Sequence, residues 1–185
     1  MRYILFSALL AAAPALAQHG HPAASYAGQE TRAIKALSEK EVGDLLAGAG
    51  MGFAKAAELN RYPGPMHALE HADALSLTPA QREALTSLMA RHKAEARELG
   101  RELVERERHL DTLFASRGAD SASVDAALAR IGEATGRLRG SHLKTHLEAT
   151  RILTPAQVDR YVELRGYGQA GTRDAHGHRN KGTDH

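Results

Sequence analysis

Two pairs of histidines carry a spacing that suits a metal site. His67 and His71 are four residues apart, and so are His142 and His146. Residues four apart on a helix share one face, so each pair would direct two imidazoles to the same side. Neutral imidazoles in that arrangement bind Zn, Cu, Ni or Co ions. The sequence therefore predicts a transition-metal site among these four residues, without identifying the metal.

A fifth histidine offers a second arrangement. In an antiparallel pair of long helices, His142 and His146 come level with the turn that carries His92. The pair at His67 and His71 falls about four to ten residues from that level, on the order of 6–15 Å along a helix. A cluster of His92, His142 and His146 therefore competes with a cluster of the two pairs. A hydrogen-bonded core position and a solvated helix face are the alternatives to metal binding, and all remain open at this level.

A sharper motif lies within the first pair. The segment from His67 to His71 reads H-A-L-E-H and matches the H-x-x-E-H signature of inverted zinc proteases. In that interpretation Glu70 is the general base and Glu148 the third ligand. We disfavour it, because those enzymes are built on large mixed α/β domains and this chain has no strand-forming segments. No other catalytic arrangement stands out, and we expect a protein that is not an enzyme.

The elements that must position the histidines are expected to be helices. Ala, Leu, Glu and Arg, which are strong helix formers, dominate the composition and predict an all-α chain. The pentapeptide L-T-P-A-Q occurs at residues 77–81 and again at 153–157. Its Thr suits an N-cap, its Pro the first helical position and its Gln a capping box, so each copy should begin a helix.

Two of the expected helices are long and amphipathic. They span Pro79 to about Arg117 and about Ser121 to Ile152. Shorter helices are expected after the capping box that begins at Ser38, at residues 51–60 and 66–75, and after the second L-T-P-A-Q copy. Together they form a predicted helical domain over residues 34–167.

The two ends of the chain carry different signals. Residues 1–17 combine a basic start, an apolar run and an A-L-A cleavage site, which is typical of a secretory signal peptide. The apolar run is shorter than the ~20 residues needed to span a bilayer, so we expect a periplasmic protein without a membrane span after cleavage. Residues 18–33 and 168–185 are polar, contain histidines and are predicted to be disordered.

Composition narrows the function classes. The chain has no cysteine, which excludes disulfides and thiolate metal sites. Its formal net charge is +2, positive and negative side chains are closely mixed along residues 91–111, and aromatic residues make up only 4%. A nucleic-acid-binding protein would need a concentrated basic face or stacking aromatics, so no nucleic-acid partner is expected.

Two L-T-x-x-Q motifs in a small, exported, cysteine-free helical protein resemble the Spy/CpxP family. The resemblance covers about Pro65 to Leu164. It implies an antiparallel four-helix hairpin, often a homodimer with a curved cradle surface. Family members act as ATP-independent chaperones of unfolded proteins, as envelope-stress regulators or as metal sensors.

The metal-sensing relatives carry histidine ligands. In the cobalt–nickel resistance sensor an H-x3-H pair precedes the first turn, as His67 and His71 do here, and a later histidine near the position of His142 and His146 completes the site. The position of that sensor's glutamate ligand holds Met89 in this chain. The resemblance therefore implies a metal sensor or resistance protein with an envelope sensor protein as partner, or else a holdase chaperone.

Overall fold

The computed structural model describes residues 25–167, and these contain six helices, no strand and 69% helix. The predicted all-α class is therefore confirmed. The chain divides into two units, residues 1–31 and 32–185, and all six helices belong to the second. The predicted signal peptide at 1–17, residues 18–24 of the first tail and the tail at 168–185 lie outside the described residues, while residues 25–33 form turns and bends.

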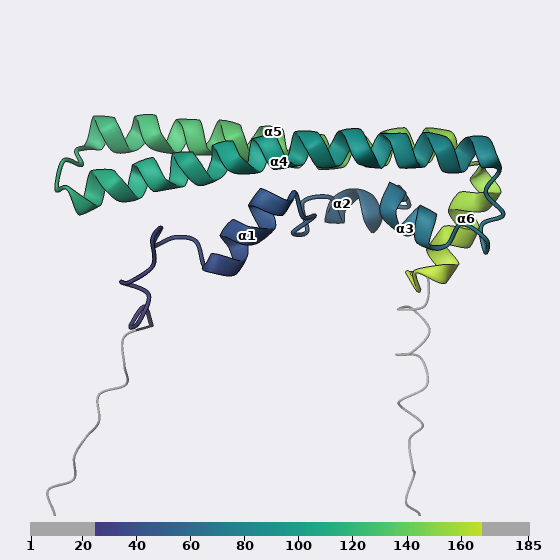
Figure 1. The fold of residues 1–185 in the computed structure, drawn as a ribbon, viewed down its shortest axis with the longest axis horizontal. Coiled ribbons are helices and arrows are strands. Elements are labelled where there is room, and N and C mark those ends of the chain that lie inside the picture. The colour runs from purple at the N-terminus through teal and green to yellow at the C-terminus, as the bar shows by residue number, and fades with distance from the viewer. Residues whose placement is uncertain (1–24, 168–185) are drawn as a thin grey trace, which may run out of the picture. The chain divides into compact units, whose positions relative to one another are not determined.

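Two long helices form an antiparallel hairpin (Figure 1). They are α4 (Pro79–Ala115) and α5 (Ser121–Ile152), close to the predicted spans. α4 ends at Ala115 with Ser116 as its C-cap, and Arg117 follows with a φ of 57°, a left-handed conformation that cannot continue a helix. The side chain of Asp120 then accepts a hydrogen bond from the Ser123 amide and begins α5.

The repeated pentapeptide begins two helices, as predicted. Thr78 and Gln81 form a reciprocal capping box at the start of α4, and Thr154 and Gln157 do the same at α6 (Pro155–Leu164). The two glutamine amides also bond to each other, at 2.8 and 3.0 Å. The repeat therefore serves a shared local need, because each copy caps its own helix and the pair ties the two helix starts together.

Three short helices precede the hairpin: α1 (Glu39–Ala47), α2 (Lys55–Glu58) and α3 (Pro65–Glu70). The expectation of helices over 51–60 and 66–75 is too long. Met51 and Gly52 have φ angles of 42° and 77°, which delays the start of α2 to Lys55. α3 ends at the His71 cap, and Ser76 has a φ of 49°, so residues 71–76 form turns rather than helix.

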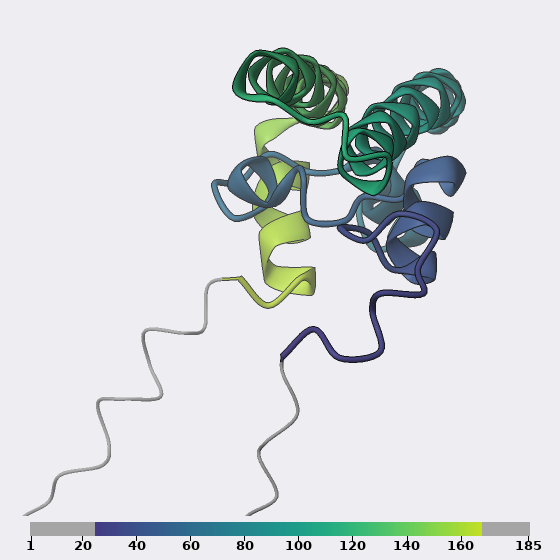
Figure 2. The same ribbon diagram turned by 90° about the vertical axis from the view of Figure 1, so that its left-hand side faces the viewer.

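The short helices lie on one side of the hairpin and complete its core (Figures 1 and 2). Ile34 and Leu45 are buried against Ala96 and Leu138 of the long helices. A second cluster joins α3, both long helices and α6 around Tyr161. The arrangement as a four-helix hairpin, implied by the resemblance, stays a prediction. Among residues 25–167, no helix is long and apolar enough to cross a membrane.

Candidate metal centre

One cavity of about 670 Å³ lies between residues 47–67 and the hairpin. Four of the five predicted histidines line it. They come from three helices: His67 from α3, His92 from α4, and His142 and His146 from α5. His71 does not line the cavity. The cavity therefore combines the predicted cluster of His92, His142 and His146 with His67, which is one member of the predicted pair His67 and His71.

His92 and His142 are the two buried histidines of the cavity lining. His92 Nε2 lies 3.1 Å from His142 Nδ1, and Ser141 Oγ lies 3.3 Å from His92 Nδ1. Phe53 stacks on the His142 ring at a centroid distance of 5.5 Å. Burial, and then the charges of His92 and His146, lower the pKa of His142 to about 4, and burial also lowers the pKa of His92. Both imidazoles are therefore neutral at pH 7, the state that binds metal.

Two buried polar atoms on the cavity residues lack a hydrogen-bond partner within residues 25–167. They are His142 Nε2 and Glu58 Oε2. An unsatisfied buried polar group costs about 1–3 kcal/mol, and native structures keep few of them. Both residues line the same cavity, and Glu58 Oε2 lies 3.6 Å from His146 Nδ1. A bound cation would satisfy Glu58 Oε2, and also His142 Nε2 in the tautomer whose Nδ1 donates to His92 Nε2.

His67 and His146 each have one ring nitrogen anchored by an oxygen. His146 Nδ1 lies 2.8 Å from the carbonyl oxygen of Tyr62, and His67 Nδ1 lies 2.8 Å from Glu70 Oε2. A carbonyl or carboxylate oxygen only accepts, so Nδ1 is the donor in both rings, and in the neutral imidazole Nε2 is then the acceptor. His146 Nδ1 also lies 3.6 Å from Glu58 Oε2. Metal-binding histidines are usually oriented in this way.

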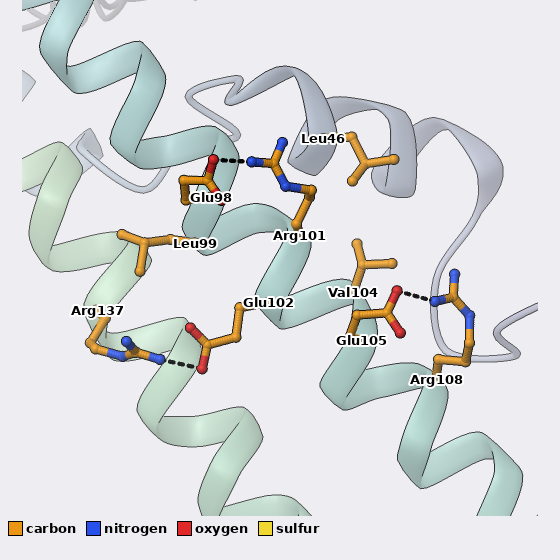
Figure 3. Close-up of a pocket in the computed structure, with 9 residues that line it drawn as sticks. All are labelled: Leu46, Glu98, Leu99, Arg101, Glu102, Val104, Glu105, Arg108 and Arg137. Atoms are coloured by element: carbon orange, nitrogen blue, oxygen red, sulfur yellow. Dashed lines mark hydrogen bonds and ion pairs between the residues drawn. The ribbon is translucent and has the colours of Figure 1, made fainter.

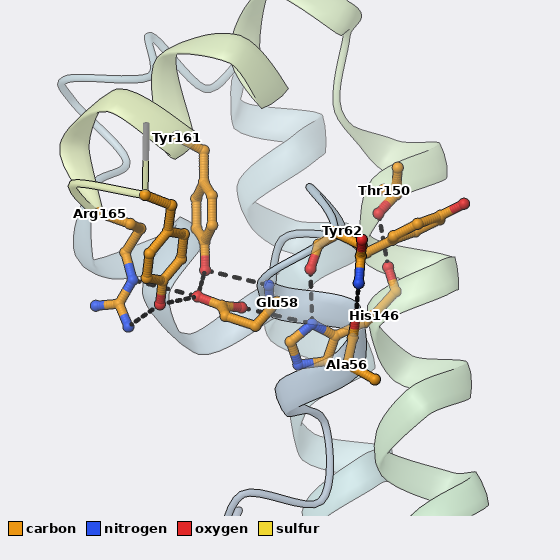
Figure 4. A network of polar contacts seen from close by, with 10 residues as sticks. Ala56, Glu58, Tyr62, His146, Thr150, Tyr161 and Arg165 are labelled. Atoms are coloured by element: carbon orange, nitrogen blue, oxygen red, sulfur yellow. Dashed lines mark hydrogen bonds and ion pairs between the residues drawn. The ribbon is translucent and has the colours of Figure 1, made fainter. Parts of the chain in front are cut away.

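The sequence analysis missed Glu58, which ends α2 (Figure 4). Its Oε1 accepts hydrogen bonds from the Tyr161 hydroxyl at 2.6 Å, the Tyr167 hydroxyl at 3.0 Å and Arg165 Nε at 3.2 Å. All three donors follow Glu58 by more than a hundred residues. No local spacing signals such a network, and the segment before Pro65 lies outside the family resemblance.

The protease interpretation finds no support in the geometry. Glu70 is exposed and bonded to His67, and His71 caps the end of α3 away from the cavity lining. Glu148, its third ligand, pairs instead with Arg91 at the surface. The four residues that this mechanism needs are therefore not brought together, because His67 pairs with Glu70 while His71 and Glu148 lie elsewhere.

The donor types around the cavity fit a transition metal. Imidazole nitrogens and one carboxylate oxygen come from the residues above, and Met66 and Met89 also line the space. Nevertheless, no three His, Cys, Asp or Glu side chains in the described part of the chain stand close enough to hold an ion as placed. Binding at this cavity therefore requires side-chain rotation that brings the donors together.

Comparison with known proteins adds one positive finding. A family model described as heavy-metal resistance matches residues 4–160, and this model belongs to the Spy/CpxP-like clan. No curated protein and no solved structure matches the chain.

Proposed function

Because the chain belongs to the heavy-metal resistance family, we propose that its helical core binds a transition-metal ion through the histidines of the cavity. The ion is Zn, Cu, Ni or Co, and the ligands are drawn from His67, His92, His142 and His146. The observation that carries this proposal is the buried, unpartnered Nε2 of His142 on a cavity lined by three further histidines.

The proposed role is metal sensing or resistance in the periplasm, after removal of residues 1–17. Binding rather than catalysis is the proposed activity. As in the family that the sequence resembles, the protein is proposed to act as a homodimer and to report to an envelope sensor protein. Neutral His142 and His92 support this role, because an imidazole that is already uncharged near pH 7 binds metal without first losing its second proton.

Calorimetric titration of the mature chain with Zn²⁺, Cu²⁺, Ni²⁺ and Co²⁺ tests the proposal. Histidines in the tails would contribute weak binding, so His19, His21, His176, His178 and His185 are first replaced by alanine. We expect micromolar or tighter binding at near-integer stoichiometry. His142→Ala and His146→Ala should each abolish it, whereas His109→Ala, at an exposed position outside the cavity lining, should not. Unchanged binding in both cavity variants would refute the proposal.

A second candidate function is an ATP-independent holdase for unfolded proteins. It is supported by Phe114 and Leu128, which are 59% and 50% exposed near the connection between the long helices. Exposed apolar side chains of this size can contact unfolded clients. Suppression of a client's aggregation without ATP, lost in the double variant Phe114→Ser and Leu128→Ser, would establish it, and no suppression at equimolar protein would exclude it.

A further inference from the structure

The histidine cavity is far larger than a metal ion needs. Its volume of about 670 Å³ falls within the range of roughly 300–1,000 Å³ that is typical of pockets for small organic molecules. Apolar side chains and glycines make up about half of its lining, and the largest of them are Leu59, Met66 and Met89. Contact with an apolar ligand would remove these side chains from water. The space therefore suits an organic ligand with an apolar body.

The charges of the lining favour an anion. Its only carboxylate within residues 25–167 is Glu58, which is matched by Arg165, whose Nε lies 3.2 Å from Glu58 Oε1. Lys55 of α2 and Lys93 of α4 also line the cavity, and both are exposed, which places them where it opens to solvent. Neither lysine forms an ion pair in the described part of the chain, although two other lysines there do. Two positive charges therefore remain at the mouth of the cavity for a ligand to neutralise.

We propose that the cavity binds an amphipathic organic anion. The apolar body of this ligand lies against Leu59, Met66 and Met89, and its anionic group lies beside Lys55 and Lys93. The apolar stems of the two lysines extend the surface that such a ligand covers, while their charged ends stay in water. An organic cation of the same size would meet two like charges. The inference goes beyond the proposed function, because this binding needs no metal ion.

Calorimetric titration of the mature chain with decanoate tests the proposal. Metal ions are first removed by dialysis against EDTA and then against buffer, and decanoate is kept below the concentration at which it forms micelles. We expect binding at near-integer stoichiometry. Decyltrimethylammonium, which has the same alkyl chain and a positive head group, should bind about tenfold or more weakly, because the two lysine charges then repel the ligand instead of attracting it.

The double variant Lys55→Gln and Lys93→Gln tests the charge at the mouth of the cavity. Glutamine is a good helix former without a charge, and we expect a loss of about fivefold or more in decanoate affinity. Lys144→Gln is the matched control, because Lys144 is an exposed lysine of α5 outside the cavity lining. The affinity of this control should change less than about twofold.

The double variant Met66→Gln and Met89→Gln tests the apolar part of the lining. It keeps the length of both side chains and replaces apolar atoms with amides, so we expect a loss of about tenfold in decanoate affinity. Leu147→Gln is the matched control, because Leu147 is 42% exposed and lies outside the cavity lining, and this variant should bind decanoate as the parent protein does.

Three results overturn the proposal: no binding of decanoate by the parent protein, equal affinity for the two probes, or parental affinity for decanoate in both double variants. The comparison of the two probes uses the parent protein, so it decides the proposal even if a double variant fails to fold. Because no metal ion is present in these titrations, their failure leaves the proposed function untouched.

Discussion

Two hollows beside the hairpin differ in how their polar groups are satisfied. The hollow between α1 and the middle of the long helices is lined by charged side chains that pair with one another, Glu98 with Arg101, Glu105 with Arg108 and Glu102 with Arg137 (Figure 3). The histidine cavity instead contains a buried imidazole nitrogen and a buried carboxylate oxygen without hydrogen-bond partners in residues 25–167, and the oxygen lies 3.6 Å from His146 Nδ1.

The difference teaches where to look for a ligand site in this fold. Exposed ion pairs contribute about 0–1 kcal/mol, and water satisfies whatever they leave open. A buried donor has no such alternative, so its unpaired state persists only where the surrounding packing holds it. The hollow lined by ion pairs therefore needs no ligand, and the histidine cavity is the place of the proposed metal site.

The largest expected effect concerns pH and the metal-free protein. His142 has a pKa of about 4 when folded and about 6.5 when unfolded, so the unfolded chain binds the proton more tightly. Stability is full above pH 6.5 and is lost as the pH falls toward 4, by about 3 kcal/mol. Urea denaturation across this range measures the loss. His142→Leu, which removes the ionisable group, should flatten the profile, and an unchanged slope would contradict the assignment.

Gly100→Ala should disturb both hollows together. Gly100 lies where α1 crosses α4, and an added Cβ would collide with the backbone carbonyl of Leu45. The end of α1 lines both spaces, through Leu46 on one side and Gly48 on the other. We expect a loss of about 2–3 kcal/mol in the free energy of unfolding.

The matched control for that change lies on α5. At Gly132 an added Cβ meets nothing within 4 Å, so Gly132→Ala should stabilise the helix by about 0.5–1 kcal/mol. Thermal unfolding of the two variants separates steric collision from helix propensity. Equal effects in both would show that α1 does not pack on Gly100.

Tyr161→Phe tests how much the hydrogen bond from the Tyr161 hydroxyl to the Glu58 carboxylate contributes to stability. The Tyr161 hydroxyl donates to Glu58 Oε1 at 2.6 Å and accepts from the Gly64 amide at 3.3 Å. Its loss removes a hydrogen bond to a charged group in the core, which we expect to cost about 2 kcal/mol by urea denaturation. Tyr62→Phe deletes the same atom from a side chain that is 40% exposed and contacts His146 through its backbone, so it should leave stability unchanged.

Much of the fold could be predicted because its signals are local. The capping boxes at Ser38, Thr78 and Thr154 lie within four residues each, and all three form. The short helices were predicted too long. Left-handed Met51 and Gly52 delay α2, and only Gly52 carries a signal in its residue type, while nothing in the types of residues 71–75 marks the end of α3 at the His71 cap.

The site was predictable only in part, for a related reason. Spacing identified the histidines, and His92, His142 and His146 do line one space. The position of His71 depends on where α3 ends, which the sequence did not reveal. Glu58 depends on Tyr161, Arg165 and Tyr167, and no pattern in the sequence relates residues so distant before the chain has folded.

The smallest expected effect concerns the hollow that is lined by ion pairs, and it tests most directly whether the two hollows are independent. Arg137 bonds to Glu102 across the two long helices, and both side chains are partly exposed, at 46% and 30%. Arg137→Gln should therefore cost less than about 1 kcal/mol, and the cost should shrink further in 1 M NaCl because salt screens exposed charges. Metal affinity should not change. A loss of metal binding in this variant would mean that the two hollows are coupled through α5, and that the unpartnered donors of the cavity depend on the ion pairs beside α1.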